Sequence, residues 1–262
     1  MLDLLDLLTH RPRAPRTDDA HDHLAIMRRA FFREFAPEIR LGAGLALFRV
    51  FAIPRLSALL ARTGRWTHTP TRRLGRTVDL LSILVADGPD GPHGAAALAR
   101  MNAAHAPHGL ANDDMLYVLT TFVTEPARVI DRYGRRPLRP VEREAACRFW
   151  RDVGRRMGIR DIPESFAAMV ELARAYEAEH LHDAESNRVV AEGALSAMLQ
   201  RLPPSLAPFG RTALSALLEP PVRRACGLPD APRPLTWALT GLGAARRGLG
   251  TLARGSTSMM SS

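Results

Sequence analysis

The chain has 262 residues, of which 46% are hydrophobic and 24% charged, so it is long and apolar enough to bury a globular core. It carries 36 basic and 27 acidic residues, a formal net charge of +9, and every one of the basic residues is arginine. The absence of lysine excludes Schiff-base catalysis, a phosphate-loop lysine and a Ser-Lys dyad. The charge itself is compatible with nucleic acid, an anionic membrane, an anionic cofactor or the codon bias of a GC-rich genome.

The two cysteines and the chain's hydropathy indicate a cellular compartment. Cys147 and Cys226 are far apart, and neither has the neighbouring cysteine that a zinc site or a redox CxxC motif requires. The first 13 residues are acidic and apolar before they become basic, the reverse of a secretory signal. No stretch approaches the roughly 18 uncharged apolar residues of a membrane span. We therefore expect a reduced protein in the cytoplasm, without a transmembrane segment.

Helical periodicity starts at about residue 24. Apolar residues recur three or four positions apart in 41–52, 80–85 and 116–123, and the alternation typical of strands is absent. Glycines and prolines interrupt the pattern at Pro54, Gly64, 88–91, 107–109, Gly134, Gly158, 203–204, 220–221 and Pro232. The sequence therefore predicts an all-α fold of about eight to ten helices.

No internal linker of appreciable length divides this pattern. We expect one helical domain over residues 23–250, preceded by a leader at 1–22 and followed by a disordered tail at 251–262. Within the C-terminal part, 235–247 combines apolar residues with paired arginines, which gives it a weak capacity for peripheral membrane contact.

Several familiar catalytic patterns are missing. The sequence has neither a HExxH zinc motif nor a GxSxG nucleophile elbow. Glu177 and His180 have the Glu-x-x-His spacing of di-iron bundles, but no second motif of this kind accompanies them. A stronger candidate is the segment 72–77, whose arginines and threonine precede an apolar helix, together with His105 at the end of another helix. Arginine side chains and a helix N-terminus both favour an anion.

Several motifs extend this candidate site, within a stretch from about Ala52 to Pro229 that covers more than half of the chain. They are Arg72-Arg73-x-x-x-Thr77, Arg100-Met101-Asn102-x-x-His105, 112–119 (NDDMLYVL), Phe122-Val123-x-Glu125-Pro126-x-Arg128, Tyr133-Gly134-x-Arg136, 154–159 (GRRMGI), Asp161-Ile162-Pro163 and Tyr176-Glu177-x-x-His180. In this order they resemble the MpaB-type oxygenases, a family that includes the rubber oxygenase latex clearing protein. The resemblance implies a helical domain with haem b in a pocket between helices, and oxidation or cleavage of an apolar, isoprenoid-like alkene by O₂.

The resemblance also implies site residues. His105 matches the proximal iron ligand, and Arg73 and Thr77 match polar residues of the haem pocket. Arg73, Arg76 and Thr77 are the candidate catalytic residues. Arg76 replaces a lysine of the rubber-oxygenase branch, and arginine cannot deprotonate to bind iron. Arg73, Arg76 and Arg128 are available to the haem propionates, and a carbonyl at the helix end is expected to orient the His105 ring. The apolar faces of 78–85 and 115–123 are expected to line the pocket.

Two questions stay open at this level. The glutamate proposed as a base in the rubber branch has no counterpart, since Glu34 and Glu38 lie outside every matching motif. An alternative reading is a non-catalytic basic helical interaction protein with a decayed haem site. Nucleic-acid binding is not expected, because the arginines are spread over every segment and no aromatic platform accompanies them. The expected partners are O₂ and a small apolar substrate.

Overall fold

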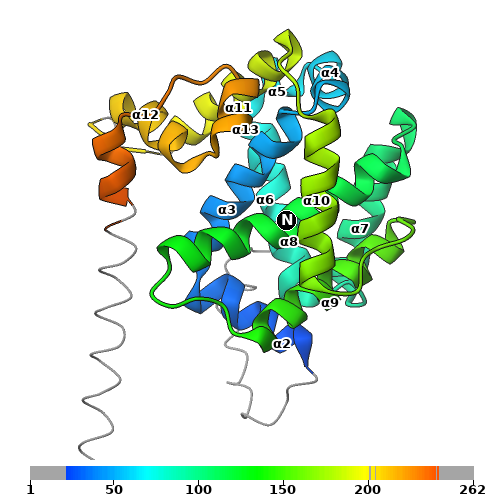
Figure 1. The fold of residues 1–262 in the computed structure, drawn as a ribbon. Helices are drawn as coiled ribbons and strands as arrows, with labels where there is room; N and C mark the ends of the chain where they lie inside the picture. Colours follow the sequence, from blue (N-terminus) through cyan, green and yellow to red (C-terminus); the bar gives the residue numbers. More distant parts are fainter. Residues whose placement is uncertain (1–21, 201, 204, 240, 242–262) are drawn as a thin grey trace, which may run out of the picture.

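The computed structural model describes residues 22–200, 202–203, 205–239 and 241, and within them the chain is helical without a strand (Figure 1). The elements are α2 (His23–Arg29), the π-helical η1 (Ala30–Glu34), α3 (Ala36–Phe51), α4 (Pro54–Arg62), α5 (Arg65–His68), α6 (Pro70–Asp87), α7 (Pro92–His105), the 3₁₀ turn η2 (Ala106–His108), α8 (Asn112–Tyr133), α9 (Pro140–Arg156), α10 (Phe166–His180), α11 (Glu185–Leu199), α12 (Ala207–Leu217) and α13 (Pro220–Ala225). Nine of these described helices have nine or more residues. The all-α prediction is confirmed.

Prolines and glycines set many helix boundaries where the sequence predicts them. Pro54 opens α4 at a position where its missing N–H is not needed. Gly88, with φ of 83°, follows the last residue of α6, and Gly109, with φ of 57°, ends the turn after α7. The predicted leader lies outside the described residues except for Asp22, whose side chain caps α2. The predicted tail 251–262 and most of 235–247 also lie outside them.

The two central helices are α3 and α8, which form the most extensive helix pair of the described part. They approach closely because Gly42 has no side chain. A Cβ at Gly42 would stand 2.4 Å from the Cα of Pro126, inside van der Waals contact. Pro126 lies within α8 without ending it. Around this pair, α11 and α13 lie at the top of the view in Figure 1, α7 lies at the right and α2 lies at the bottom.

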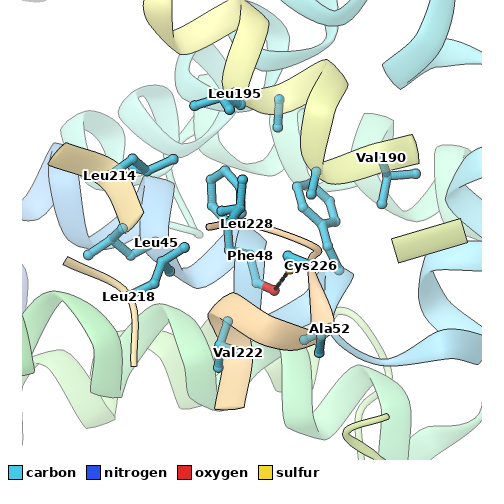
Figure 2. Close-up of a cluster of buried hydrophobic side chains, with 14 of the residues drawn as sticks. Leu45, Phe48, Ala52, Val190, Leu195, Leu214, Leu218, Val222, Cys226 and Leu228 are labelled. Carbon is cyan, nitrogen blue, oxygen red and sulfur yellow. Dashed lines mark hydrogen bonds between the residues drawn. The ribbon is translucent and has the colours of Figure 1, made fainter. Parts of the chain in front are cut away.

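The core is divided into two large clusters. In the first, Leu45 and Phe48 of α3 meet residues of α11 to α13, and the Cys226 thiol donates to the Phe48 carbonyl at 3.4 Å (Figure 2). The second joins α2, α6, α7, α8 and α9 around buried residues such as Leu84 and Phe149. Residues of both clusters line one cavity, so the cavity lies where the two cores meet.

Both cysteines are buried and form no disulfide. Burial raises the pKa of Cys147 to about 11 and that of Cys226 to about 12. Each thiol is therefore protonated at neutral pH and unreactive as a nucleophile.

No single helix of the described chain is both long and apolar enough to cross a membrane. The pair α3 and α4 would reach the required length and apolarity only together, and it is bent by 98° at the break between the two helices.

Candidate functional site

The main cavity of the described structure has a volume of about 740 Å³, within the range of small-molecule and cofactor sites. Its wall is mostly apolar. Both segments predicted as walls contribute, through Leu80, Leu81, Ile83, Met115, Val118, Leu119 and Phe122. The sequence did not predict the contribution of α3 to α5, which add Leu47, Val50, Phe51, Leu56, Leu59, Leu60 and Trp66. The cavity therefore suits an apolar ligand.

Four of the five predicted site residues line this cavity: Arg73, Arg76, Thr77 and His105. The first three lie on α6, where spacings of three and four residues place side chains on one helical face. His105 is the last residue of α7, which packs against α6. The tertiary structure therefore brings together two motifs that are 28 residues or more apart in sequence.

His105 is half-buried, and its Nδ1 atom is fully enclosed without a hydrogen-bond partner in the described chain. The expected carbonyl acceptor is thus not found. Burial lowers the pKa of His105, and the positive charge of Arg73 and the neighbouring His108 lower it further. The imidazole is therefore neutral at pH 7, the form in which histidine binds a metal.

Arg73 is half-buried, and its guanidinium has no carboxylate partner among the described residues. Its Nη1 donates to Thr77 Oγ1 at 2.5 Å, and its Cζ lies 5.6 Å from the Trp66 ring centroid. Burial lowers the pKa of Arg73, and so do the charges of Arg65 and Arg76. Since arginine stays protonated, an unbalanced positive charge stands beside the apolar cavity. This arrangement favours an anionic group on the ligand.

Trp66 also has a buried polar atom without a hydrogen-bond partner among the described residues. The residue is 1% exposed, and its Nε1 atom has no hydrogen-bond partner in the described structure. A buried N–H without an acceptor is unfavourable, so a ligand oxygen within reach would stabilise this wall. The sequence signal was weak, because Trp66 lies outside every family motif quoted above.

These features match the chemistry of haem b. The macrocycle is apolar, its two propionates favour cationic partners, and its iron accepts a neutral imidazole as an axial ligand. The cavity offers an apolar wall, the guanidiniums of Arg73 and Arg76, and the imidazole of His105. The residues present therefore fit a haem.

Arg128, the fifth predicted residue, does not line the main cavity. It donates to Glu125 Oε1 at 2.5 Å in a separate ion-pair network on α8. The centre of that network is Arg49 of α3, which bonds Glu125 and Glu177 at 2.8 Å each and Glu219 at 2.6 Å. This network borders a second cavity of about 550 Å³. Sequence analysis did not predict Arg49, because its partners come from three distant parts of the chain: α8, α10 and the residue that precedes α13.

The two glutamates considered as a base also lie elsewhere. Glu34 bonds Arg136, and Glu38 is buried in α3 outside the main cavity wall. The acidic residues that do line the main cavity are Asp79 and Asp114. Glu177 belongs to the Arg49 network, and His180 packs edge-on against Tyr176.

Three fungal relatives are similar to this chain. It is 28% identical to "ER-bound oxygenase mpaB'" of Penicillium brevicompactum over 207 residues, 72% of this chain and 49% of that protein. It is 27% identical to "ER-bound oxygenase mpaB" of Penicillium roqueforti (strain FM164) over 198 residues, 69% of this chain and 66% of that protein. A 31% identity to "ER-bound oxygenase mpaB" of Penicillium brevicompactum covers 44% of this chain and 31% of that protein. The chain thus spans less than two thirds of the length of each relative.

A family profile gives the broader match. The family described as "ER-bound oxygenase mpaB/B'/Rubber oxygenase, catalytic domain" matches residues 39–253. This region contains the helices that form the main cavity and all five predicted site residues. The chain therefore belongs to the mpaB/rubber oxygenase catalytic-domain family, an oxygenase family.

Proposed function

We propose that this protein is a haem b-dependent oxygenase that uses O₂ to oxidise or cleave an apolar alkene, such as an isoprenoid. The observation that carries the proposal is the juxtaposition of His105 and Arg73 in one apolar cavity. Within the described chain, Nδ1 of His105 is enclosed without a hydrogen-bond partner, and the half-buried guanidinium of Arg73 has no carboxylate partner. A ligand with a metal centre and carboxylates would provide partners for His105 and Arg73.

In this proposal His105 holds the iron, and Arg73 and Arg76 bind the carboxylates of the cofactor. Bound haem would supply the chemistry that activates O₂. Thr77 accepts a hydrogen bond from Arg73 and so fixes the direction of the guanidinium. Arg76 is exposed and cannot lose its proton, so it would serve as a cation and not as an iron ligand.

The apolar wall has two roles. It binds a water-insoluble substrate by removing its surface from water, at roughly 25 cal/mol per Å². It also keeps bulk water away from the reacting carbon atoms, which protects reactive species from side reactions. Met115, Val118 and Phe122 on α8 contribute to this surface. A location in the cytoplasm stays a prediction of the sequence.

The test is an absorption spectrum of purified wild-type, His105→Ala and His108→Ala proteins, with haem quantified after extraction. His108 is the matched control, because it is a second histidine in the same cavity wall. We expect a Soret band with about one haem per chain in wild type and in the His108 variant, and loss of most of it in the His105 variant. Wild-type protein that stays colourless after haem is added would contradict the proposal.

The second candidate function is a non-catalytic interaction protein that keeps the fold without the cofactor. The observation in its favour is Arg76, which stands where the rubber-oxygenase branch has a lysine. A non-catalytic protein of this kind is expected to be colourless when purified. Its arginines give little support for nucleic-acid binding, because many of those described are paired with carboxylates of the same chain, for example in the Arg49 network and at Arg136.

A further inference from the structure

One acidic side chain in the main cavity wall is buried. Of the two carboxylates that line the cavity, Asp79 is exposed, whereas Asp114 is 5% exposed. Most of the surrounding wall is apolar. Burial of a carboxylate in such a place is unfavourable unless its oxygens receive hydrogen bonds.

The hydrogen bonds to Asp114 converge on one of its two oxygens. Arg55 Nε donates to Oδ1 at 2.7 Å, Arg55 Nη2 lies 2.6 Å from the same atom, and the Tyr176 hydroxyl also donates to it. Arg55 further donates to the Tyr176 oxygen at 3.1 Å. Burial, together with the bond to Asp114, raises the pKa of Tyr176, so this phenol remains a donor. Two helices, α4 and α10, therefore hold the carboxylate in one orientation.

The other oxygen, Oδ2, receives no hydrogen bond from any described group, and it is not among the fully enclosed unpartnered atoms. It is therefore an oriented, accessible acceptor on a residue that lines the cavity. A charged acceptor in such surroundings binds an O–H or N–H donor strongly, and it discriminates against a molecule that lacks the donor.

We infer that Asp114 Oδ2 is a binding site for a hydroxyl group of the cavity's apolar ligand. Oδ2 accepts the hydroxyl proton in a hydrogen bond, while Arg55 and Tyr176 position the carboxylate through Oδ1. The inference rests on the proposed function, because it names the substrate class of that same cavity. The substrate is then an apolar alkene that carries a hydroxyl group, rather than a pure hydrocarbon.

The experiment compares geraniol with geranyl methyl ether by titration calorimetry on the protein as purified, with its haem content recorded. The ether is the more apolar molecule, so a cavity that acts by apolar burial alone binds it at least as tightly as the alcohol. A hydrogen bond to a carboxylate instead gives geraniol an advantage of about tenfold or more in Kd.

Two substitutions locate the acceptor. Asp114→Asn keeps the volume and can keep Oδ1 toward Arg55, but it places an N–H donor at the position of Oδ2. Both probes can accept from that donor, so the preference for geraniol disappears. Asp79→Asn, the matched control, changes the exposed carboxylate of the same wall and keeps the preference.

Four results would overturn the inference. Two concern the wild-type protein, which would bind neither probe or would bind the ether as tightly as geraniol. The other two are a preference that survives in Asp114→Asn and a preference that is lost in Asp79→Asn. The comparison of geraniol with the ether on wild-type protein tests the inference even if Asp114→Asn does not fold. Failure of the proposed function looks different. Haem-free protein that cannot be loaded but prefers geraniol through Asp114 contradicts the oxygenase proposal alone, whereas haem-loaded protein without the preference contradicts this inference alone.

Discussion

Gly42 of α3 lies directly against the backbone of Pro126 in α8, so that a Cβ at position 42 would stand 2.4 Å from the Pro126 Cα and 2.8 Å from its nitrogen. Backbone atoms on a central helix cannot move aside as the end of a flexible side chain can. This contact allows α3 and α8, the most extensive helix pair of the described structure, to pack closely. It also supports the residues of α8 that line the main cavity.

Substituting Gly42 therefore tests the helix crossing. Gly42→Ala is expected to destabilise the fold by about 1–3 kcal/mol, because the added methyl group forces α3 away from α8. The measurement is urea unfolding followed by circular dichroism. Gly75→Ala is the control, since a Cβ there meets nothing within 4 Å, and we expect a gain of about 0.5–1 kcal/mol from helix propensity. Equal stability of Gly42→Ala and wild type would contradict the packing.

The coupling between Arg73 and His105 is testable before haem is added. Because the charge of Arg73 contributes to the low pKa of His105, Arg73→Met is expected to raise that pKa toward its ordinary value while the burial effect remains. The titration of the ring protons by NMR measures it. Arg72→Met removes an exposed neighbouring charge and should leave the pKa nearly unchanged. An unchanged His105 pKa in Arg73→Met would show that the two groups are not coupled.

Glu142 makes the stability of the fold depend on pH. Burial alone would raise its pKa, but hydrogen bonds from Arg136 and Arg139 outweigh this effect and lower the pKa to about 2. Since the folded pKa lies below the unfolded value of about 4.3, the stabilisation is fully present above pH 5 or so and is lost as pH falls toward 2.

We therefore expect Glu142→Gln to lose about 2–3 kcal/mol of stability at pH 7, and the difference from wild type to shrink steadily below about pH 4. Unfolding curves at several pH values measure this. Glu144→Gln, at an exposed ion pair with Arg148, should change stability by about 0.5 kcal/mol or less. A Glu142→Gln effect that is independent of pH would contradict the assigned cause.

The Arg49 network predicts a large structural effect away from the main cavity. Arg49→Leu leaves the carboxylates of Glu125 and Glu177 without their shared cation, and we expect a loss of about 3–5 kcal/mol. Arg174→Leu, at an exposed pair with Glu171, serves as the control with a loss of about 0–1 kcal/mol. Thermal unfolding compares the two. A loss below that of the control would mean that Arg49 contributes no net stability.

Much of the fold is readable from local sequence. The helical period of apolar residues predicted the all-α class, and prolines and glycines such as Pro54 and Gly88 marked real helix ends. These features depend on backbone sterics and on neighbours within one helical turn, which the sequence lists directly. Pro126 shows where such rules fail, because it lies inside α8, where its backbone packs against Gly42 from a distant helix.

The candidate site was likewise predictable only in part from the sequence. Arg73, Arg76 and Thr77 were predictable as a group, since their spacing alone places them on one face of α6. The position of His105 at a helix end made it a candidate, and the family resemblance gave it the role of iron ligand. Arg128 was expected beside them from its motif, yet its charge is paired with Glu125 next to Arg49.

By itself, then, the sequence determined the helices, the cationic face of α6 and the family. Which side chains share the cavity follows from the tertiary fold instead, because it depends on how the helices cross. The crossing leaves Trp66 Nε1 and His105 Nδ1 buried without hydrogen-bond partners in the part of the chain that the structure describes. It also orients Asp114 through Arg55 and Tyr176 from two other helices. Contacts between residues some 60 positions apart, such as Asp114 and Tyr176, follow from side-chain packing of whole helices, which no local pattern encodes.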